Sequence, residues 1–150
     1  MPNFRTTRSV NHSANNMFDL VADVESYPEF VPLCQSLYVR SQEETDDQTV
    51  LLADMTVAYK VLRETFTSRV VLDRDGLKIT TQAVEGPFRN MENNWQFRGL
   101  SETTCDISFS LEYEFRSYAI QLLVGGLFDR AFRKYADAFE QRADQVYRRP

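Results

Sequence analysis

The sequence has few of the residues from which metal and nucleophilic sites are built. Its 150 residues include one histidine, His12, and two cysteines, Cys34 and Cys105. Two cysteines this far apart match neither a disulfide framework nor a zinc motif. One histidine is too few for a histidine-based metal site and leaves little from which to build a charge-relay triad. We therefore expect no metal, no bound cofactor and no catalytic residue of these kinds.

Long apolar runs are missing as well. No run reaches the ~18 residues that a membrane-spanning helix needs, and residues 1–10 lack the apolar core of a signal peptide. Internal repeats, low-complexity tracts and linkers are not seen either. Apolar residues nevertheless make up 43% of the chain and aromatic residues 13%, which is enough for a hydrophobic core. The sequence therefore predicts one soluble domain over residues 1–150, in a reducing compartment.

Positive charge is scarce overall but unevenly placed. The chain has 17 basic and 22 acidic residues, a balance that argues against DNA as a partner. Residues 117–150 hold six of the basic and four of the acidic residues, so the C-terminal segment is basic. A basic segment can bind anionic lipid headgroups or ribosomal RNA. The third alternative is a solvated helix face with local ion pairs.

The N-terminal region predicts a strand, a helix and a turn. Phe4–Val10 is typical of a short strand. Ser13 then fits a helix N-cap, because its hydroxyl can accept a hydrogen bond from an otherwise unpaired backbone N–H. The spacing of the apolar residues predicts a helix over Ala14–Val24. The next segment, Tyr27–Pro32, contains two prolines, which leave room for one turn of helix between them.

From Cys34 to Arg116, apolar residues alternate with polar ones, which is typical of strands with one buried face. The clearest run is Ile107–Phe115, where the alternation holds for nine residues. The other rows are Leu51–Tyr59, Phe66–Leu72 (interrupted by Ser68), Leu77–Ala83 and Trp95–Phe97. Short turns separate the rows, so we expect antiparallel pairing and a sheet with one face in water.

The C-terminal segment changes to helical periodicity. Apolar residues recur at spacings of three and four from Tyr118 to Tyr147, which predicts one helix ~45 Å long. A one-sided sheet must bury its apolar face against another element, and this helix is the only large one available. The sequence therefore predicts an α+β fold in which a curved antiparallel sheet wraps around a long C-terminal helix.

The first part of this helix, Tyr118–Phe128, has a single polar residue, Gln121. A surface helix has a polar face, so three alternatives stay open. The stretch is buried on all sides, or it lines a lipid tunnel and touches a bilayer or partner with its other face, or it forms a dimer contact. Gly125 and Gly126 lower the helix propensity. We interpret them as a close helix–sheet contact, with a flexible joint that opens the tunnel as the alternative.

Polar side chains in the predicted inward rows are candidates for a binding site. Glu64 shares the face of Phe66. Its carboxylate either points into an apolar cavity, where it must be paired or protonated, or turns to solvent at a bulge. Tyr59 and Tyr113 either supply hydroxyls deep in the pocket or pack as core aromatics with the hydroxyl at the rim.

Five blocks of residues resemble the coenzyme Q-binding START-like family, within the polyketide cyclase/Bet v-like superfamily. In chain order they are Tyr27–Pro32 with Cys34, Arg63–Val70, Val84–Phe88, Phe115–Ser117 and Phe128–Phe132. The resemblance implies a helix-grip (START-like) fold, in which about seven antiparallel strands and the C-terminal helix enclose a tunnel for an apolar ligand. In this family the implied ligand is ubiquinone. A close branch, the ribosome association toxins, is implied to bind the large ribosomal subunit.

We therefore predict a non-enzymatic protein that binds ubiquinone and shields or delivers it to support respiratory electron transport. The alternative is a ribosome association toxin-like protein that binds the large ribosomal subunit. An enzyme is disfavoured, since the sequence shows no nucleophile–base pair. We expect a bacterial cytoplasmic protein that visits the surface of the inner membrane. The predicted ligand-binding residues are Tyr27, Phe30, Val31, Met55, Tyr59, Glu64, Phe66, Phe88, Trp95, Tyr113, Phe115, Leu123, Leu127 and Phe128.

Overall fold

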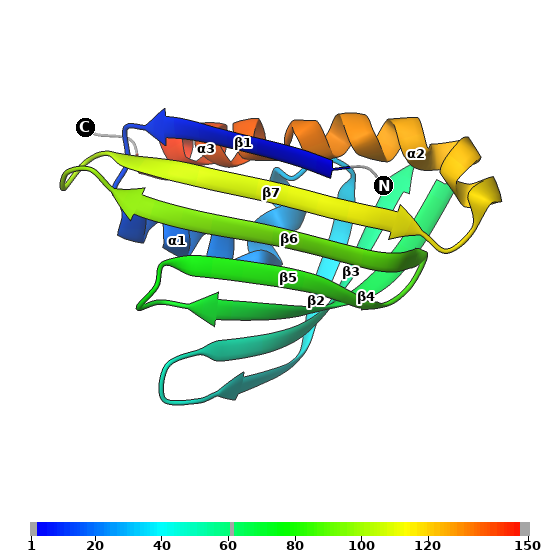
Figure 1. Cartoon of the computed structure of the whole chain (residues 1–150), viewed down its shortest axis with the longest axis horizontal. Helices are drawn as coiled ribbons and strands as arrows, with labels where there is room; N and C mark the ends of the chain where they lie inside the picture. Colours follow the sequence, from blue (N-terminus) through cyan, green and yellow to red (C-terminus); the bar gives the residue numbers. More distant parts are fainter. Residues whose placement is uncertain (1–2, 61, 148–150) are drawn as a thin grey trace.

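A computed structural model describes residues 3–60 and 62–147 and shows one antiparallel sheet with helices on its concave side (Figure 1). The strands are β1 (Asn3–Val10), β2 (Cys34–Glu44), β3 (Thr49–Tyr59), β4 (Leu62–Asp73), β5 (Lys78–Glu85), β6 (Phe88–Gly99) and β7 (Cys105–Phe115). The helices are α1 (Ala14–Ala22), the 3₁₀-helix η1 (Val24–Glu29), α2 (Tyr118–Arg133) and α3 (Tyr135–Val146). The predicted α+β class and the seven strands are confirmed.

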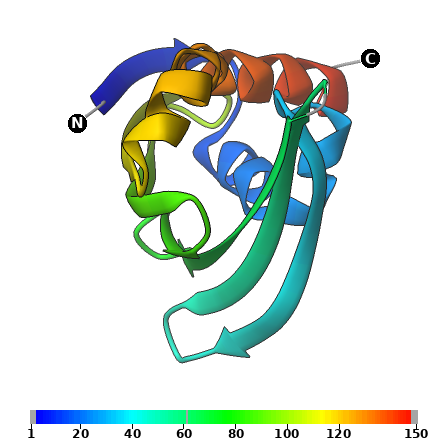
Figure 2. The same cartoon turned by 90° about the vertical axis from the view of Figure 1, so that its right-hand side faces the viewer.

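The sheet has the strand order β1-β7-β6-β5-β4-β3-β2, so β1 and β2 form its two edges. Figure 2 shows how the sheet curves and how α2 and α3 close its open side. This is the arrangement of the helix-grip fold. It arises because alternate residues of each strand point to the concave face, which is apolar and must be covered.

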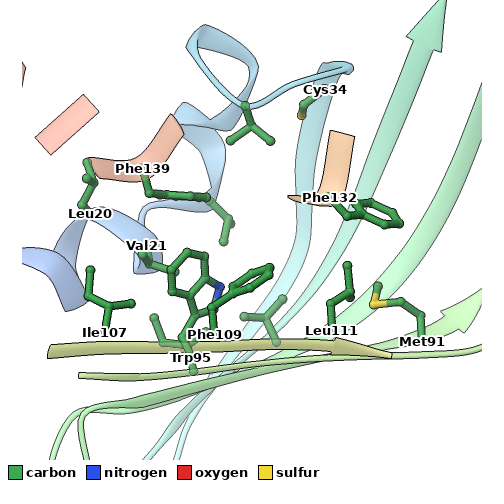
Figure 3. Close-up of a cluster of buried hydrophobic side chains, with 14 of the residues drawn as sticks. Leu20, Val21, Cys34, Met91, Trp95, Ile107, Phe109, Leu111, Phe132 and Phe139 are labelled. Carbon is green, nitrogen blue, oxygen red and sulfur yellow. The ribbon is translucent and has the colours of Figure 1, made fainter. Parts of the chain in front are cut away.

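Strand β7 shows the alternation most clearly. Its buried residues are separated by half-buried or exposed ones along the whole strand, as the sequence predicts. The concave face carries Trp95 and Phe109 at its centre, with their ring centroids 4.7 Å apart. The Phe139 side chain of α3 reaches the same point, with its ring centroid 4.9 Å from that of Trp95. Figure 3 shows these side chains meeting between the sheet and the helices.

The N-terminal helix agrees with the prediction at its start and differs at its end. The Ser13 hydroxyl accepts a hydrogen bond from the Asn16 N–H at 3.1 Å, which confirms the N-cap. Helix α1 ends at Ala22, two residues earlier than predicted, and the chain continues as η1. The helical turn predicted between the two prolines lies earlier in the chain, because η1 starts at Val24 and already includes Pro28.

The C-terminal helix is broken, and the prediction of one continuous helix is wrong. At Lys134 the backbone N–H bonds to the Ala131 carbonyl at 3.0 Å, three residues back, so the α-helical ladder tightens and stops for one residue. The two helices on either side of the break pack on different residues of the sheet. Phe132 of α2 packs on Tyr113, while Phe139 of α3 packs on Trp95.

The interpretation of the glycine pair as a close helix–sheet contact is also wrong. A Cβ built at Gly125 would meet the side chain of Gln121 on the same helix, and one at Gly126 would lie 3.7 Å from the Arg130 guanidinium. The glycine that does require its small size is Gly86. Its φ is +129°, and a Cβ there would lie 2.5 Å from the Cβ of Phe66.

This contrast gives a matched pair of variants. Gly86→Ala forces a strained φ and a clash with β4, so we expect the free energy of unfolding to fall by about 2 kcal/mol or more. Gly126→Ala adds a methyl group on an exposed helix position and removes a flexible residue, so we expect a gain of about 0.5–1 kcal/mol. Urea denaturation followed by circular dichroism measures both. Equal effects of the two variants would contradict this account.

Candidate functional site

A small cavity lies between the concave face of the sheet and the C-terminal helices; we call it the inner cavity. Its volume is about 70 Å³. A single water needs about 10–15 Å³ on the same measure, so the cavity has room for a few water-sized groups. Figure 3 shows Met91, Trp95 and Leu111 rising from the strands toward Phe132 and Phe139 of the helices. The remaining lining residues are Val24, Tyr27, Leu37, Ala53, Met55, Phe66, Ser68, Val70, Thr81, Asn93 and Tyr135.

The apolar cavity contains a short row of polar side chains, none of which is among the predicted ligand-binding residues. Ser68, Thr81 and Asn93 line it from three neighbouring strands, β4, β5 and β6. Thr81 and Asn93 are direct cross-strand partners. The Asn93 amide nitrogen donates to the Ser110 carbonyl at 2.9 Å. The Ser68 hydroxyl is buried and has no hydrogen-bond partner in the described part of the chain. An unpaired buried hydroxyl is costly, and it would orient the polar end of a bound molecule.

The segment Tyr27–Pro32, which holds three of the predicted ligand-binding residues, is packed against the core. The Tyr27 hydroxyl donates to the Val21 carbonyl at 2.5 Å. The rings of Tyr27 and Phe30 both lie edge-on to Phe139, at 5.2 Å and 5.0 Å between centroids. Tyr27 lines the inner cavity, whereas Phe30 and Val31 line neither that cavity nor the groove described next. Phe30 therefore packs against Phe139 of α3, and Val31 is buried in the core.

A second depression lies between α2 and the β3–β4 turn; we call it the outer groove. Its volume is about 60 Å³. Five predicted site residues line it: Tyr59, Glu64, Leu123, Leu127 and Phe128. The other lining residues are Leu33, Val57, Ala58, Leu62, Arg63, Ile120 and Val124. The predicted set thus does not form one tunnel: four of its fourteen residues line the inner cavity, five line the outer groove and the other five line neither.

Three of these five residues are exposed, and for Glu64 this is the second of the two predicted alternatives, reached without a bulge in the β3–β4 pairing. Glu64 does pair in register with the buried Val57, but the concave face opens into the outer groove at this end of the sheet, so its carboxylate lies in solvent. Tyr59 is 43% exposed and stacks against the Lys60 ammonium, so its hydroxyl is not deep in a pocket. Leu123 is 73% exposed and is not a wall of the inner cavity.

Four phenylalanines separate the inner cavity from the outer groove; we call them the aromatic wall. They are Phe66, Phe88, Phe115 and Phe128. Phe66 lines the inner cavity and Phe128 lines the outer groove. Phe88 lies between them, 5.3 Å from Phe66 and 6.2 Å from Phe128 between ring centroids. A continuous tunnel, as the resemblance implied, therefore requires these rings to move.

Tyr113 is buried next to this wall and lines neither cavity. Its ring centroid lies 5.0 Å from that of Phe132, and its hydroxyl has no hydrogen-bond partner among the described residues. Burial raises the pKa of Tyr113 to about 12, and the nearby Asp129 carboxylate adds to the rise. Tyr113 is therefore a neutral phenol and packs as a core aromatic, the second of the two predicted alternatives, although its hydroxyl is enclosed instead of at a rim.

The residues that the predictions missed could have been found from their register. Ser68 lies between the inward residues Phe66 and Val70, and Thr81 follows Ile79 on the inward row of β5. Asn93 precedes Trp95 at the same spacing. A short polar residue at an inward position of an otherwise apolar row is thus the sequence feature that predicts a polar group in the cavity.

Within residues 3–60 and 62–147, no three His, Cys, Asp or Glu side chains lie close enough together to hold a metal ion. None of the helices described in that range combines the length and the apolar character needed to cross a membrane.

Comparisons with known proteins place the chain among START-like proteins. A family model described as "Polyketide cyclase / dehydrase and lipid transport" matches residues 10–140. The ribosome association toxin RatA of Pseudomonas aeruginosa is 37% identical over 136 residues, which cover 91% of each chain. The mitochondrial coenzyme Q-binding protein COQ10 of Dictyostelium discoideum is 25% identical over 94% of this chain and 68% of its own. The Zhui aromatase/cyclase of Streptomyces sp. R1128 shares the fold, with a TM-score of 0.81, 17% identity and coverage of 98% and 96%.

The buried phenol of Tyr113 predicts a loss of stability at alkaline pH. Tyrosine ionises near pH 10 in the unfolded chain but near 12 in the folded protein, so the unfolded state releases the proton first. The free energy of unfolding is therefore unaffected below about pH 10 and falls as the pH rises toward 12. We expect Tyr113→Phe to weaken this fall. Urea denaturation at neutral and alkaline pH measures it.

The control is Tyr118→Phe, because Tyr118 is exposed. This variant should keep the alkaline loss of the unmodified protein. A Tyr113→Phe protein with the same alkaline loss as the control would show that the Tyr113 hydroxyl is not enclosed.

Proposed function

The chain belongs to the polyketide cyclase / dehydrase and lipid transport family, and on this basis we propose that it associates with the ribosome. The observation that carries the proposal is the 37% identity with the P. aeruginosa protein, which extends over 91% of both chains. The relative whose name refers to coenzyme Q is more distant, at 25%. Ribosome association, the alternative in our sequence analysis, therefore replaces ubiquinone delivery as the preferred function. The expected partner is the large ribosomal subunit.

The charges of the C-terminal helices support this proposal. Lys134 lies exposed at the break between α2 and α3, and in the described part of the chain no carboxylate pairs with it. Arg133 pairs with Asp129 at 3.0 Å and lies over the Phe4 ring, so it is less available. Ribosomal RNA is a polyanion, and cations on a protein surface bind such a chain by displacing its counterions.

Binding, as opposed to catalysis, fits the polar groups of the inner cavity. These groups include the hydroxyls of Ser68 and Thr81 and the amide of Asn93. The single histidine, His12, instead pairs with Asp144 at 2.7 Å, at the outer end of α3. A hydroxyl nucleophile needs an adjacent general base, and His12 does not line this cavity. We therefore propose a protein that acts by association. Such a role places it in the cytoplasm.

Cosedimentation with purified bacterial large subunits tests the main proposal. We expect the protein to pellet with the subunits at low salt and to be released as the KCl concentration rises. Lys134→Glu should weaken binding several-fold and lower the slope of log affinity against log salt by about one. Lys78→Glu on the convex face of the sheet is the matched control. No pelleting with large subunits at low salt would refute ribosome association.

A second candidate function is binding of an apolar molecule with a polar head, such as ubiquinone. The observation that favours it is the inner cavity, which is lined by apolar and aromatic side chains apart from the Ser68, Thr81 and Asn93 row. A quinone carbonyl can accept a hydrogen bond from the Ser68 hydroxyl, which has no other partner in the described residues. Because the cavity has only about 70 Å³, such a ligand would have to displace the aromatic wall.

Organic extraction and mass spectrometry of the protein purified from its native host test this second function. The expected result is a quinone at close to one molecule per chain. Ser68→Ala should weaken retention of added ubiquinone about fivefold to tenfold, the loss of one hydrogen bond. Ser108→Ala, on the convex face, should leave retention unchanged. An extract without quinone, together with no uptake of added ubiquinone, would refute the candidate.

A further inference from the structure

The first half of α2 exposes large apolar side chains that neither function above explains. Tyr118, Leu122 and Leu123 are 77%, 69% and 73% exposed. The opposite side of the same helix buries Val124 and Phe128. The helix is therefore apolar on both sides. Exposed apolar side chains that gather in one place mark an interaction site more often than single ones do.

The end of β3 extends this apolar surface. Tyr59 at the end of β3 lines the outer groove together with Leu123, so the two lie on either side of it. We call Tyr59, Tyr118, Leu122 and Leu123 the apolar tip. Three of these side chains come from α2 and one from the end of β3, and all four are exposed.

Cations surround the apolar tip. Lys60 lies over the Tyr59 ring, 5.3 Å from its centroid, and Arg63 lines the outer groove. The Arg130 guanidinium lies beside Gly126, one turn beyond Leu122. Within residues 3–60 and 62–147, no ion pair involves Lys60, Arg63 or Arg130, and all three are exposed. Glu64 is the one carboxylate that lines the groove. A local positive rim thus stands out on a chain with a net charge of −5.

Negative charge gathers at the far end of the molecule. The end of β2 carries Glu43 and Glu44, and the turn that follows carries Asp46 and Asp47, all exposed. Figures 1 and 2 both show this hairpin extending away from the start of α2. The molecule is therefore electrically polar, with its basic, apolar end opposite its acidic end. Near a negatively charged surface, the apolar tip would face that surface and the acidic hairpin would point away.

We propose that the apolar tip and its basic rim bind the surface of an anionic lipid bilayer. Projecting leucine and tyrosine side chains enter the interface between headgroups and acyl chains, and flanking lysine and arginine side chains bind anionic headgroups. RNA would be bound by stacking and by cations, which leaves the two exposed leucines without a role. A second copy would bring the two positive rims together, which opposes self-association through this surface. The proposal is independent of ribosome binding and adds a membrane contact to it.

Cosedimentation with vesicles tests this proposal. The probes are large unilamellar vesicles of equal parts phosphatidylglycerol and phosphatidylcholine, and vesicles of phosphatidylcholine alone. We expect binding to the anionic vesicles only, with a partition coefficient that falls as salt is added. Leu122→Ser with Leu123→Ser should lower that coefficient about tenfold or more. Lys60→Gln with Arg63→Gln should lower it about fivefold for each charge removed.

Matched controls separate this surface from general effects. Leu100→Ser removes an exposed leucine, and Lys78→Gln with Arg5→Gln removes two cations, in each case away from the apolar tip. Both control proteins should bind vesicles normally, and all variants should keep the circular dichroism spectrum of the unmodified protein.

Three results would overturn the proposal. The first is no binding to anionic vesicles. The second is equal loss in the tip variants and their controls. The third is a protein that does not bind vesicles but forms dimers or binds ribosomal subunits, and that loses this association in the Leu122→Ser, Leu123→Ser variant. Loss of vesicle binding with ribosome cosedimentation intact would support separate surfaces for the two partners.

Discussion

Packing of α3 against the centre of the concave face is the interaction on which the rest of this structure depends. Phe139 is almost fully buried, edge-on to Trp95 at 4.9 Å and to Tyr27 at 5.2 Å. These contacts hold together a strand, the C-terminal helix and the segment after α1. Ion pairs at the rim, such as Arg142 with Glu29 at 2.8 Å, fix the same helix from outside. Without this helix the apolar face of the sheet would be open to water.

The packing is less complete beneath the junction of α2 and α3 and around α2, and the features from which the functions are proposed lie there. The inner cavity leaves part of the core empty and leaves the Ser68 hydroxyl without a partner among the described residues. Both features lower stability, and proteins tend to retain such costs at functional sites. The break at Lys134 separates the tightly held α3 from the more exposed α2. The two parts of the C-terminal segment therefore differ: α3 closes the fold, while α2 leaves large apolar side chains exposed.

More of the fold than of the candidate site could be predicted from the sequence. Alternation in β7 and the N-cap at Ser13 depend on neighbouring residues alone, and both were confirmed. The break at Lys134 could not be predicted, since no glycine or proline lies next to it. It depends on where each half of the helix packs on the sheet, Phe132 on Tyr113 and Phe139 on Trp95. The site was predicted only in part. Of the fourteen proposed residues, the structure places Tyr27, Met55, Phe66 and Trp95 on the inner cavity and five on the outer groove.

The sequence by itself determined the class of the fold, the inward rows of the strands and the apolar character of the C-terminal helices. Periodicity encodes these features residue by residue. Only the tertiary structure decided which inward residues meet. Glu64 has inward register yet reaches solvent, and Leu123 belongs to an apolar helix yet stays exposed. Periodicity tells which side of an element a residue occupies, but burial depends on whether another part of the chain covers that side. The curvature of the sheet and the break between α2 and α3 settle that coverage.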